Sequence, residues 1–289
     1  MSKCMRLSFT VSERVSGMVS DFLLGLEASG VAEDEVVDGE LMIKAYYPVG
    51  ADITYIVTAL RNYMAFLEDG SNDIEFGDLK IEEIDNSTWE FWKNELKTVK
   101  AGRVIVIRPP WEEHNPGKGE IVIEINPSRA FGTGHHETTK LCIGYIEDFV
   151  EQNGVGSMLD VGCGSGILSI TAAKLGINTV VGFDIDPVAV DEAGENIERN
   201  TTHEGLYVFT GTIEEVEGAF DLIVANVNVV AILLMKDEIK KRLASGGKFV
   251  ASGIPVTRRD EAVSGLAKTG LRLSEERRDG DWVGLVFEL

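Results

Sequence analysis

The sequence predicts an α/β protein in which a doubly wound, mostly parallel sheet follows a small α+β domain. The apolar run Met158–Val161 ends in the turn Gly162-Cys163-Gly164-Ser165-Gly166, which precedes a helical pattern, and a second apolar run, Thr179–Phe183, ends in Asp184. Strand, glycine turn, helix, strand and acid form the first half of a nucleotide-binding sheet. The order strand–helix–strand–strand–helix–strand before Asp85 predicts the small domain.

Residues 1–85 are predicted to form a ferredoxin-like domain. Alternating apolar residues indicate strands, Asp38-Gly39 is typical of a hairpin, and Gly30 is expected to end the first helix near Ser29. The expected strands are 5–11, 31–37, 41–47 and 74–84, and the two helices are expected to be capped by Ser12 and Asp52.

Residues 86–102 are predicted to be a linker, and residues 103–289 a second domain. The linker aromatics, Trp89 among them, are expected to pack between domains. Five mostly parallel strands and a closing hairpin give a Rossmann-like sheet of seven strands. The strands are expected at 158–161, 179–183, 207–211, 220–226 and 248–254, preceded by strand-like 104–107 and 121–125. The helices are expected at 188–199, 229–243 and 258–268, with one over 141–149, and the hairpin at 271–289. Asp186 is expected to be the N-cap, and Pro187 the first helical residue, of the helix over 188–199.

Composition indicates a cytoplasmic protein. Of the 289 residues 44% are hydrophobic, but no apolar run is long enough for a bilayer and the first residues lack the apolar core of a signal peptide. Cys4, Cys142 and Cys163 are an odd, scattered set without C-x-x-C spacing, which argues against a disulfide framework and a zinc site.

The net charge of −21 is concentrated at the N-terminal end. Residues 1–85 carry 6 basic and 17 acidic side chains, a net of −11, whereas the longer remainder carries −10. Two interpretations stay open: solubility, or attraction of a basic partner protein. Nucleic acid is disfavoured as a partner, because it requires patches that neutralise phosphates.

The glycine turn favours S-adenosylmethionine over a dinucleotide. Its spacing is G-x-G-x-G, and Asp160 at the end of the preceding strand would repel a pyrophosphate but suits a cation. S-adenosylmethionine carries a sulfonium and an ammonium. Asp184 is placed to accept both ribose hydroxyls. A nicotinamide or flavin cofactor and a purely structural turn are the alternatives. We predict contacts from Asp160, Gly162, Gly164, Asp184 and the following Ile185.

A second stretch, 126–139, is expected to complete the cofactor site. Its glycines and small polar residues precede an amphipathic helix, whose first N–H groups and hydroxyls can bind a carboxylate. His135, His136 and Glu137 resemble metal ligands, but adjacent residues face different ways at a helix start, so no metal is expected. The predicted contacts here are Phe131, Gly132, Thr133, Thr138 and Thr139.

The chain closely resembles the bacterial PrmA family, methyltransferases of large-subunit ribosomal protein eleven. The matching stretches are NPSRAFGTGHHETT, LDVGCGSGILSI with VVGFDIDPVAV, and FDLIVANV, supported by WEFWK. The resemblance implies a class I methyltransferase that methylates α-amino and lysine ε-amino groups and releases S-adenosylhomocysteine. It implies that the N-terminal domain recognises the ribosomal protein and that Thr138 or Thr139, Gly162, Asp184 and Asn226 contact cofactor. Family members commonly have a Leu-Ala-Asn-Pro-like run after Asn226, where this chain has Val227-Asn228-Val229-Val230.

Asn226 is the predicted catalytic residue. Methyl transfer needs an uncharged, aligned amine and exclusion of water, so the side-chain oxygen of Asn226 is expected to accept N–H bonds from the amine. A contact to cofactor alone is the other interpretation, and no dedicated general base is apparent. Three other functions are considered: methylation of a different basic protein, methylation of a small molecule, and non-catalytic cofactor binding. A monomer is the simplest expectation.

Overall fold

A computed structural model of the protein describes residues 3–26, 28, 30–36, 40–69, 77–85, 97–126, 136–153, 155–201 and 203–289. The chain divides into two compact units, Met1–Lys97 and Thr98–Leu289. The second unit therefore begins ahead of the boundary at Arg103 expected from the sequence. The expected linker aromatics Trp89, Phe91 and Trp92 lie outside the described residues.

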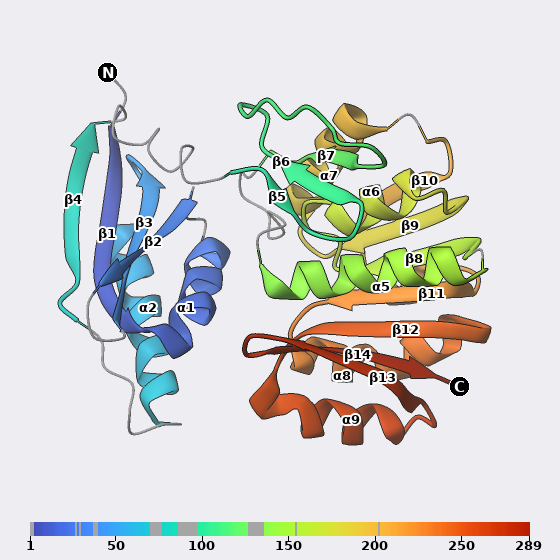
Figure 1. Ribbon diagram of the computed structural model, residues 1–289. Helices are drawn as coiled ribbons and strands as arrows, with labels where there is room; N and C mark the ends of the chain where they lie inside the picture. The colour runs from blue at the N-terminus through green and yellow to red at the C-terminus, as the bar shows by residue number, and fades with distance from the viewer. Residues whose placement is uncertain are drawn as a thin grey trace. The chain divides into compact units, whose positions relative to one another are not determined.

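The first unit is a four-stranded antiparallel sheet with two helices on one face (Figure 1). The strand order β2-β3-β1-β4 is that of a ferredoxin-like fold, as predicted. Leu7, Phe9 and Val11 alternate along β1 and are buried against the helices. The strands are β1 (Lys3–Ser12), β2 (Gly30–Val36), β3 (Glu40–Pro48) and β4 (Lys80–Asp85), and the helices are α1 (Glu13–Gly25) and α2 (Ile53–Asp69).

Two local expectations in this unit need correction. Helix α1 ends at Gly25 rather than near Ser29, and Gly30 begins β2 instead of ending the helix. Ser12 occupies the N-cap position of α1, but its side chain makes no cap hydrogen bond. Asp52 does cap α2, because its carboxylate accepts a hydrogen bond from the Tyr55 N–H at 3.0 Å.

The second unit contains a seven-stranded sheet in the order β10-β9-β8-β11-β12-β14-β13. The first five strands are parallel, and β14 runs antiparallel to both neighbours, which confirms the predicted Rossmann-like class. The strands are β8 (Ser157–Val161), β9 (Thr179–Asp184), β10 (Leu206–Thr210), β11 (Phe220–Asn226), β12 (Leu243–Pro255), β13 (Arg272–Asp279) and β14 (Trp282–Glu288).

Helices cover both faces of this sheet (Figure 1). One face packs against α5 (Glu137–Asn153), α6 (Ile167–Lys174) and α7 (Pro187–Asn200), and the other against α8 (Val229–Arg242) and α9 (Arg259–Ala267). Two short 3₁₀ turns, η1 (Ile213–Glu215) and η2 (Val256–Arg258), complete the unit. Alternate residues of the buried strands enter the two cores, as expected for a sheet covered on both sides.

A small sheet of β5 (Val99–Lys100), β6 (Ile105–Arg108) and β7 (Ile121–Glu124) packs beside α5. Strand β5 pairs with β6, so these linker residues of the sequence prediction belong to the second unit. Strands β6 and β7 are parallel, with Ile105 opposite Ile121.

Helix α8 ends at Arg242, one residue before the end predicted at Leu243, but the next strand begins at Leu243 instead of Lys248. Gly246 and Gly247 lie inside this long strand, β12, whose pairing with β11 is irregular between Phe220 and Leu222. Cys4, Cys142 and Cys163 are buried free thiols. Among the described residues, no helix is long and apolar enough to cross a membrane.

Candidate active site

The glycine turn after β8 has a backbone that only glycine adopts readily. Gly162, Gly164 and Gly166 have φ angles of 71°, 51° and 77°. The N–H groups of Gly162 and Cys163 both donate to the carbonyl of Phe183 on β9, at 3.0 and 2.9 Å. A Cβ on Gly162 would come within 2.6 Å of the Val227 side chain. The turn is therefore hydrogen-bonded to β9 and lies close to the side chain of Val227, the residue after Asn226.

Asp160 lies beneath this turn rather than at its surface, since its residue exposure is 1%. One carboxylate oxygen accepts hydrogen bonds from the N–H and hydroxyl of Ser169 on α6, at 3.0 and 2.6 Å. The other oxygen is buried without a partner among the described residues. Burial, with a contribution from the negative charge of Asp184, raises the pKa of Asp160 to about 6. The unpartnered oxygen is a ready acceptor for a cationic ligand group.

Asp184 is the last residue of β9, and its carboxylate retains hydrogen-bonding capacity for a ligand. Its oxygens accept hydrogen bonds from the N–H groups of Gly164 at 3.0 Å and Asp186 at 3.1 Å. Each carboxylate oxygen can accept a further bond. Asp186 caps α7 by accepting from the Val188 N–H at 2.9 Å, with Pro187 in the first helical turn, as predicted. The neighbouring Ile185 is 76% exposed, which is unusual for an isoleucine.

Thr138 and Thr139 are buried in the first turn of α5, at 1% and 0% exposure. The Nδ1 atom of His136 accepts from the Thr138 N–H at 3.3 Å and lies 2.8 Å from its hydroxyl. The His136 ring packs edge-on against Trp282 at 4.9 Å between centroids. His136 thus orients Thr138 at the helix start. Among the described residues, no cluster of three His, Cys, Asp or Glu side chains is placed to hold a metal.

Asn226 ends β11 beside Thr139. Its amide nitrogen donates to the Thr139 hydroxyl at 3.4 Å, whereas its side-chain oxygen is buried without a partner among the described residues. Asn228, part of the departure from the family pattern, caps α8 by accepting from the Ala231 N–H at 2.9 Å. The departure therefore preserves a helix start directly after Asn226.

The structure brings most predicted contacts to one edge of the sheet. Thr138, Thr139, Asp160, Gly162, Gly164, Asp184, Ile185 and Asn226 lie at strand ends and helix starts along the carboxyl edge, whereas Phe131, Gly132 and Thr133 lie outside the described residues. Sequence reasoning missed Ser169, which binds Asp160, and Ser252, whose hydroxyl donates to the Thr138 carbonyl at 3.3 Å. No local pattern marks either serine.

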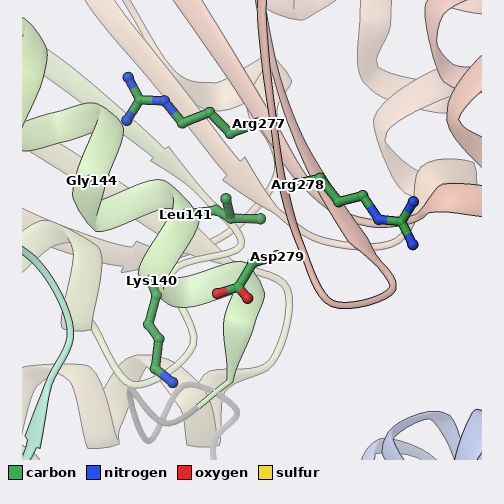
Figure 2. A pocket seen from close by; sticks show the side chains of 6 residues that line it. All are labelled: Lys140, Leu141, Gly144, Arg277, Arg278 and Asp279. Atoms are coloured by element: carbon green, nitrogen blue, oxygen red, sulfur yellow. The ribbon is translucent and has the colours of Figure 1, made fainter.

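A separate surface hollow of about 470 Å³ lies between α5 and β13 (Figure 2). Figure 2 shows Lys140, Arg277 and Arg278 extending in different directions from its wall. Arg277 pairs with Asp148 at 2.5 Å and stacks over the Tyr145 ring at 4.2 Å. These cations do not converge, so the hollow does not make an anion site. Its lining residues include none of the predicted cofactor contacts.

A sheet of this strand order, with a glycine turn after the first parallel strand and an acid after the second, defines a class I, S-adenosylmethionine-dependent methyltransferase.

Comparisons with known proteins give the family. A family model described as ribosomal protein L11 methyltransferase (PrmA) matches residues 7–289. The ribosomal protein L11 methyltransferase of Thermoanaerobacter pseudethanolicus is 38% identical over 250 residues, 86% of this chain and 80% of that protein. The one from Clostridium perfringens is 35% identical over 249 residues, 86% of this chain and 79% of that protein. The crystal structure of ribosomal protein L11 methylase from Lactobacillus delbrueckii subsp. bulgaricus has a TM-score of 0.60 at 29% identity, covering 66% of this chain and 97% of that one. The chain belongs to the ribosomal protein L11 methyltransferase (PrmA) family.

Proposed function

We propose that this enzyme methylates the N-terminal α-amine and lysine ε-amines of large-subunit ribosomal protein L11. The names of its relatives support this substrate. The observation that carries the chemistry is the buried side-chain oxygen of Asn226, which has no partner among the residues that the structure describes. A buried acceptor without a donor is costly and therefore uncommon. An amine presented at the end of β11 would supply the missing N–H group.

The residues along the carboxyl edge fit S-adenosylmethionine. The Asp160 oxygen that has no partner among the described residues suits its ammonium, and the positive φ angles of Gly162 and Gly164 give the turn that would lie beside the cofactor. Asp184 would hold the ribose hydroxyls, and the exposed Ile185 would cover the adenine face. Thr138, with Thr139, Phe131, Gly132 and Thr133, would bind the methionine carboxylate end. When bound, S-adenosylmethionine supplies a methyl group on an already activated sulfonium.

The chain's own contribution is to present a neutral amine. A lysine in water has a pKa near 10.4, so it must lose a proton on entering the site. The Thr139 hydroxyl holds the amide nitrogen of Asn226, which leaves the amide oxygen to accept an N–H of the amine and direct its lone pair. Val227 lies against the glycine turn and excludes water on this side.

The acceptor side of the site is apolar. Val230 and Leu234, one turn apart on α8, are 50% and 80% exposed, immediately after the segment that carries Asn226. Exposed apolar side chains beside a reaction centre are suited to contact a macromolecular substrate. We propose that they contact the protein around the target amine.

We further propose that residues 1–85 recognise the substrate through their negative charge. These residues hold 17 acidic and 6 basic side chains, whereas a ribosomal protein is basic. The KM for the protein substrate is expected to rise with salt, while the KM for S-adenosylmethionine changes little. A salt-independent KM for the protein would contradict this role. With a ribosomal substrate the enzyme would act in the cytoplasm, and as all proposed contacts come from one chain, a monomer suffices.

Intact-mass spectrometry of purified L11 incubated with the enzyme and S-adenosylmethionine tests the substrate. Mass gains in whole methyl-group steps are expected, and peptide mapping would locate the amines. If L11 gained no mass although the enzyme bound S-adenosylhomocysteine, the acceptor would be another molecule, with a different basic protein the first to test.

The role of Asn226 is tested by Asn226→Ala. Turnover at saturating cofactor should fall by about 10²-fold or more, because the amine loses its alignment. The affinity for S-adenosylhomocysteine should stay nearly unchanged. Asn228→Ala is the matched control: loss of the α8 cap should cost about 1 kcal/mol of stability and leave turnover nearly intact. Weaker cofactor binding with unchanged turnover in Asn226→Ala would assign Asn226 to the cofactor instead.

A further inference from the structure

Two asparagines on α7, Asn196 and Asn200, hydrogen-bond to the backbone at the end of β7 and just after it. Asn196 is 2% exposed, and Asn200 lies one helical turn further along. The side chain of Asn200 accepts from the N–H of Glu124 at 2.8 Å and donates to its carbonyl at 2.6 Å. Asparagine is a weak helix former, so a buried one inside a helix calls for a specific partner.

Asn196 makes a different pair of contacts. Its amide nitrogen donates to the carbonyl of Ser165 at 3.0 Å, inside the glycine turn. Its amide oxygen accepts from the N–H of Asn126 at 3.1 Å. Asn126 is the first residue of the stretch that leads to Thr138. The buried side chain of Asn196 thus hydrogen-bonds both to the glycine turn and to Asn126, where the predicted cofactor-binding stretch 126–139 begins.

Helix α7 is also packed directly against the glycine turn. A Cβ on Gly166 would lie 3.1 Å from the Cβ of Ala193, three residues before Asn196 on the same helix. Asp186, the N-cap of the helix, donates its N–H to the Asp184 carboxylate. Helix α7 and its N-cap therefore contact the proposed ribose acceptor, the glycine turn and Asn126.

We propose that Asn196 is a positioning residue that sets the distance between the glycine turn and the segment beginning at Asn126, and through it the affinity for the cofactor. This inference rests on the proposed cofactor contacts at Gly162, Gly164 and Thr138. Asn196 touches neither the cofactor nor the acceptor amine. It acts by holding the backbone groups of Ser165 and Asn126 at one fixed separation, so that the glycine turn is already in position when the cofactor binds.

The two contacts of Asn196 can be separated by substitution. Asn196→Asp keeps an acceptor for the Asn126 N–H but loses the donor and places negative charge against the Ser165 carbonyl. Asn196→Ala removes both contacts, and Asn196→Ser is a milder change should the other variants fold poorly. Asn200→Asp is the matched control, because it disturbs the same helix and the same strand end without touching the glycine turn.

The test is isothermal titration of each full-length variant with S-adenosylhomocysteine, together with thermal unfolding and steady-state kinetics. Asn196→Asp should bind about tenfold more weakly, which corresponds to one lost hydrogen bond, and Asn196→Ala, which loses both, should bind at least as weakly. Their KM for S-adenosylmethionine should rise, with kcat at saturation kept within about twofold. Asn200→Asp should lower the unfolding temperature comparably and keep its affinity within about twofold of wild type.

Equal affinity losses in the Asn196 and Asn200 variants would reduce Asn196 to a structural residue and overturn the proposal. Wild-type affinity in Asn196→Asp or Asn196→Ser would overturn it as well. These outcomes differ from failure of the proposed cofactor site, in which Asp184→Ala would bind as tightly as the wild-type protein.

Discussion

Replacing Asp160 with asparagine should make the unliganded enzyme more stable at neutral pH and weaken its binding of cofactor. The pKa of Asp160 rises from 3.8 to about 6. At about 1.4 kcal/mol for each pKa unit, ionised Asp160 costs the folded protein roughly 3 kcal/mol. Asparagine still offers an acceptor to Ser169 but puts an N–H group where the unpartnered oxygen lies. We therefore expect a net gain of about 1–2 kcal/mol.

The gain should depend on pH in a defined direction. Because the pKa of Asp160 is higher in the folded than in the unfolded protein, the folded state binds the proton more tightly and loses stability as Asp160 ionises. The advantage of Asp160→Asn should be full above about pH 6 and decline between about pH 6 and pH 4. Below that range Asp160 is protonated in both states, so only the cost of the misplaced N–H remains and the variant should be less stable than wild type by about 1–2 kcal/mol.

Urea-induced unfolding of both proteins between about pH 4 and pH 8 measures the difference. Titration with S-adenosylhomocysteine at neutral pH should show about tenfold weaker binding by the variant, since the ligand's ammonium loses a buried carboxylate. Ser169→Ala is a control that keeps the charge and removes one hydrogen bond. A variant that is no more stable at neutral pH, or whose advantage grows on acidification, would refute the reasoning.

Three further outcomes are expected. Gly162→Ala places an alanine at a positive φ angle and against Val227, so it should destabilise the protein by about 1–3 kcal/mol in thermal unfolding and lower the affinity for cofactor. An unchanged unfolding temperature would contradict this prediction. Leu234→Asp should raise the KM for the protein acceptor about tenfold without changing the affinity for cofactor. Tyr207→Asp, at a residue that is 62% exposed on β10, is the control and should change neither value. Equal effects of the two substitutions would show that α8 does not contact the acceptor. Glu147→Ala should lower the free energy of unfolding, measured in urea, by about 2–4 kcal/mol, because this buried carboxylate accepts hydrogen bonds from the backbone N–H groups of residues 103–105. A loss below about 1 kcal/mol would contradict that role.

Local patterns predicted the elements that position the site. The glycine spacing predicted a tight turn after β8, and Asp186-Pro187 predicted the start of α7. Both depend on interactions within a few residues, which a sequence displays directly. The boundaries were less accurate, as for β12, which begins at Leu243 instead of Lys248 and includes Gly246-Gly247. Strand β12 pairs with β11 at Leu243 and again from Lys248 onward, a tertiary pairing that local residue preferences do not record.

The sequence by itself determined the two-unit plan, the order of strands and helices, and which strand ends carry glycines, acids and Asn226. Only the tertiary structure decided what these groups contact. It turned Asp160 toward Ser169 on α6, left the amide oxygen of Asn226 without a partner in the described part of the chain, and placed Asn196 between Ser165 and Asn126. The contact between Asn196 and Asn126 joins residues 70 apart in the chain, and that between Asn226 and Thr139 joins residues 87 apart. Partners so distant are selected by the packing of whole helices on the sheet, and no periodicity in the sequence records that choice.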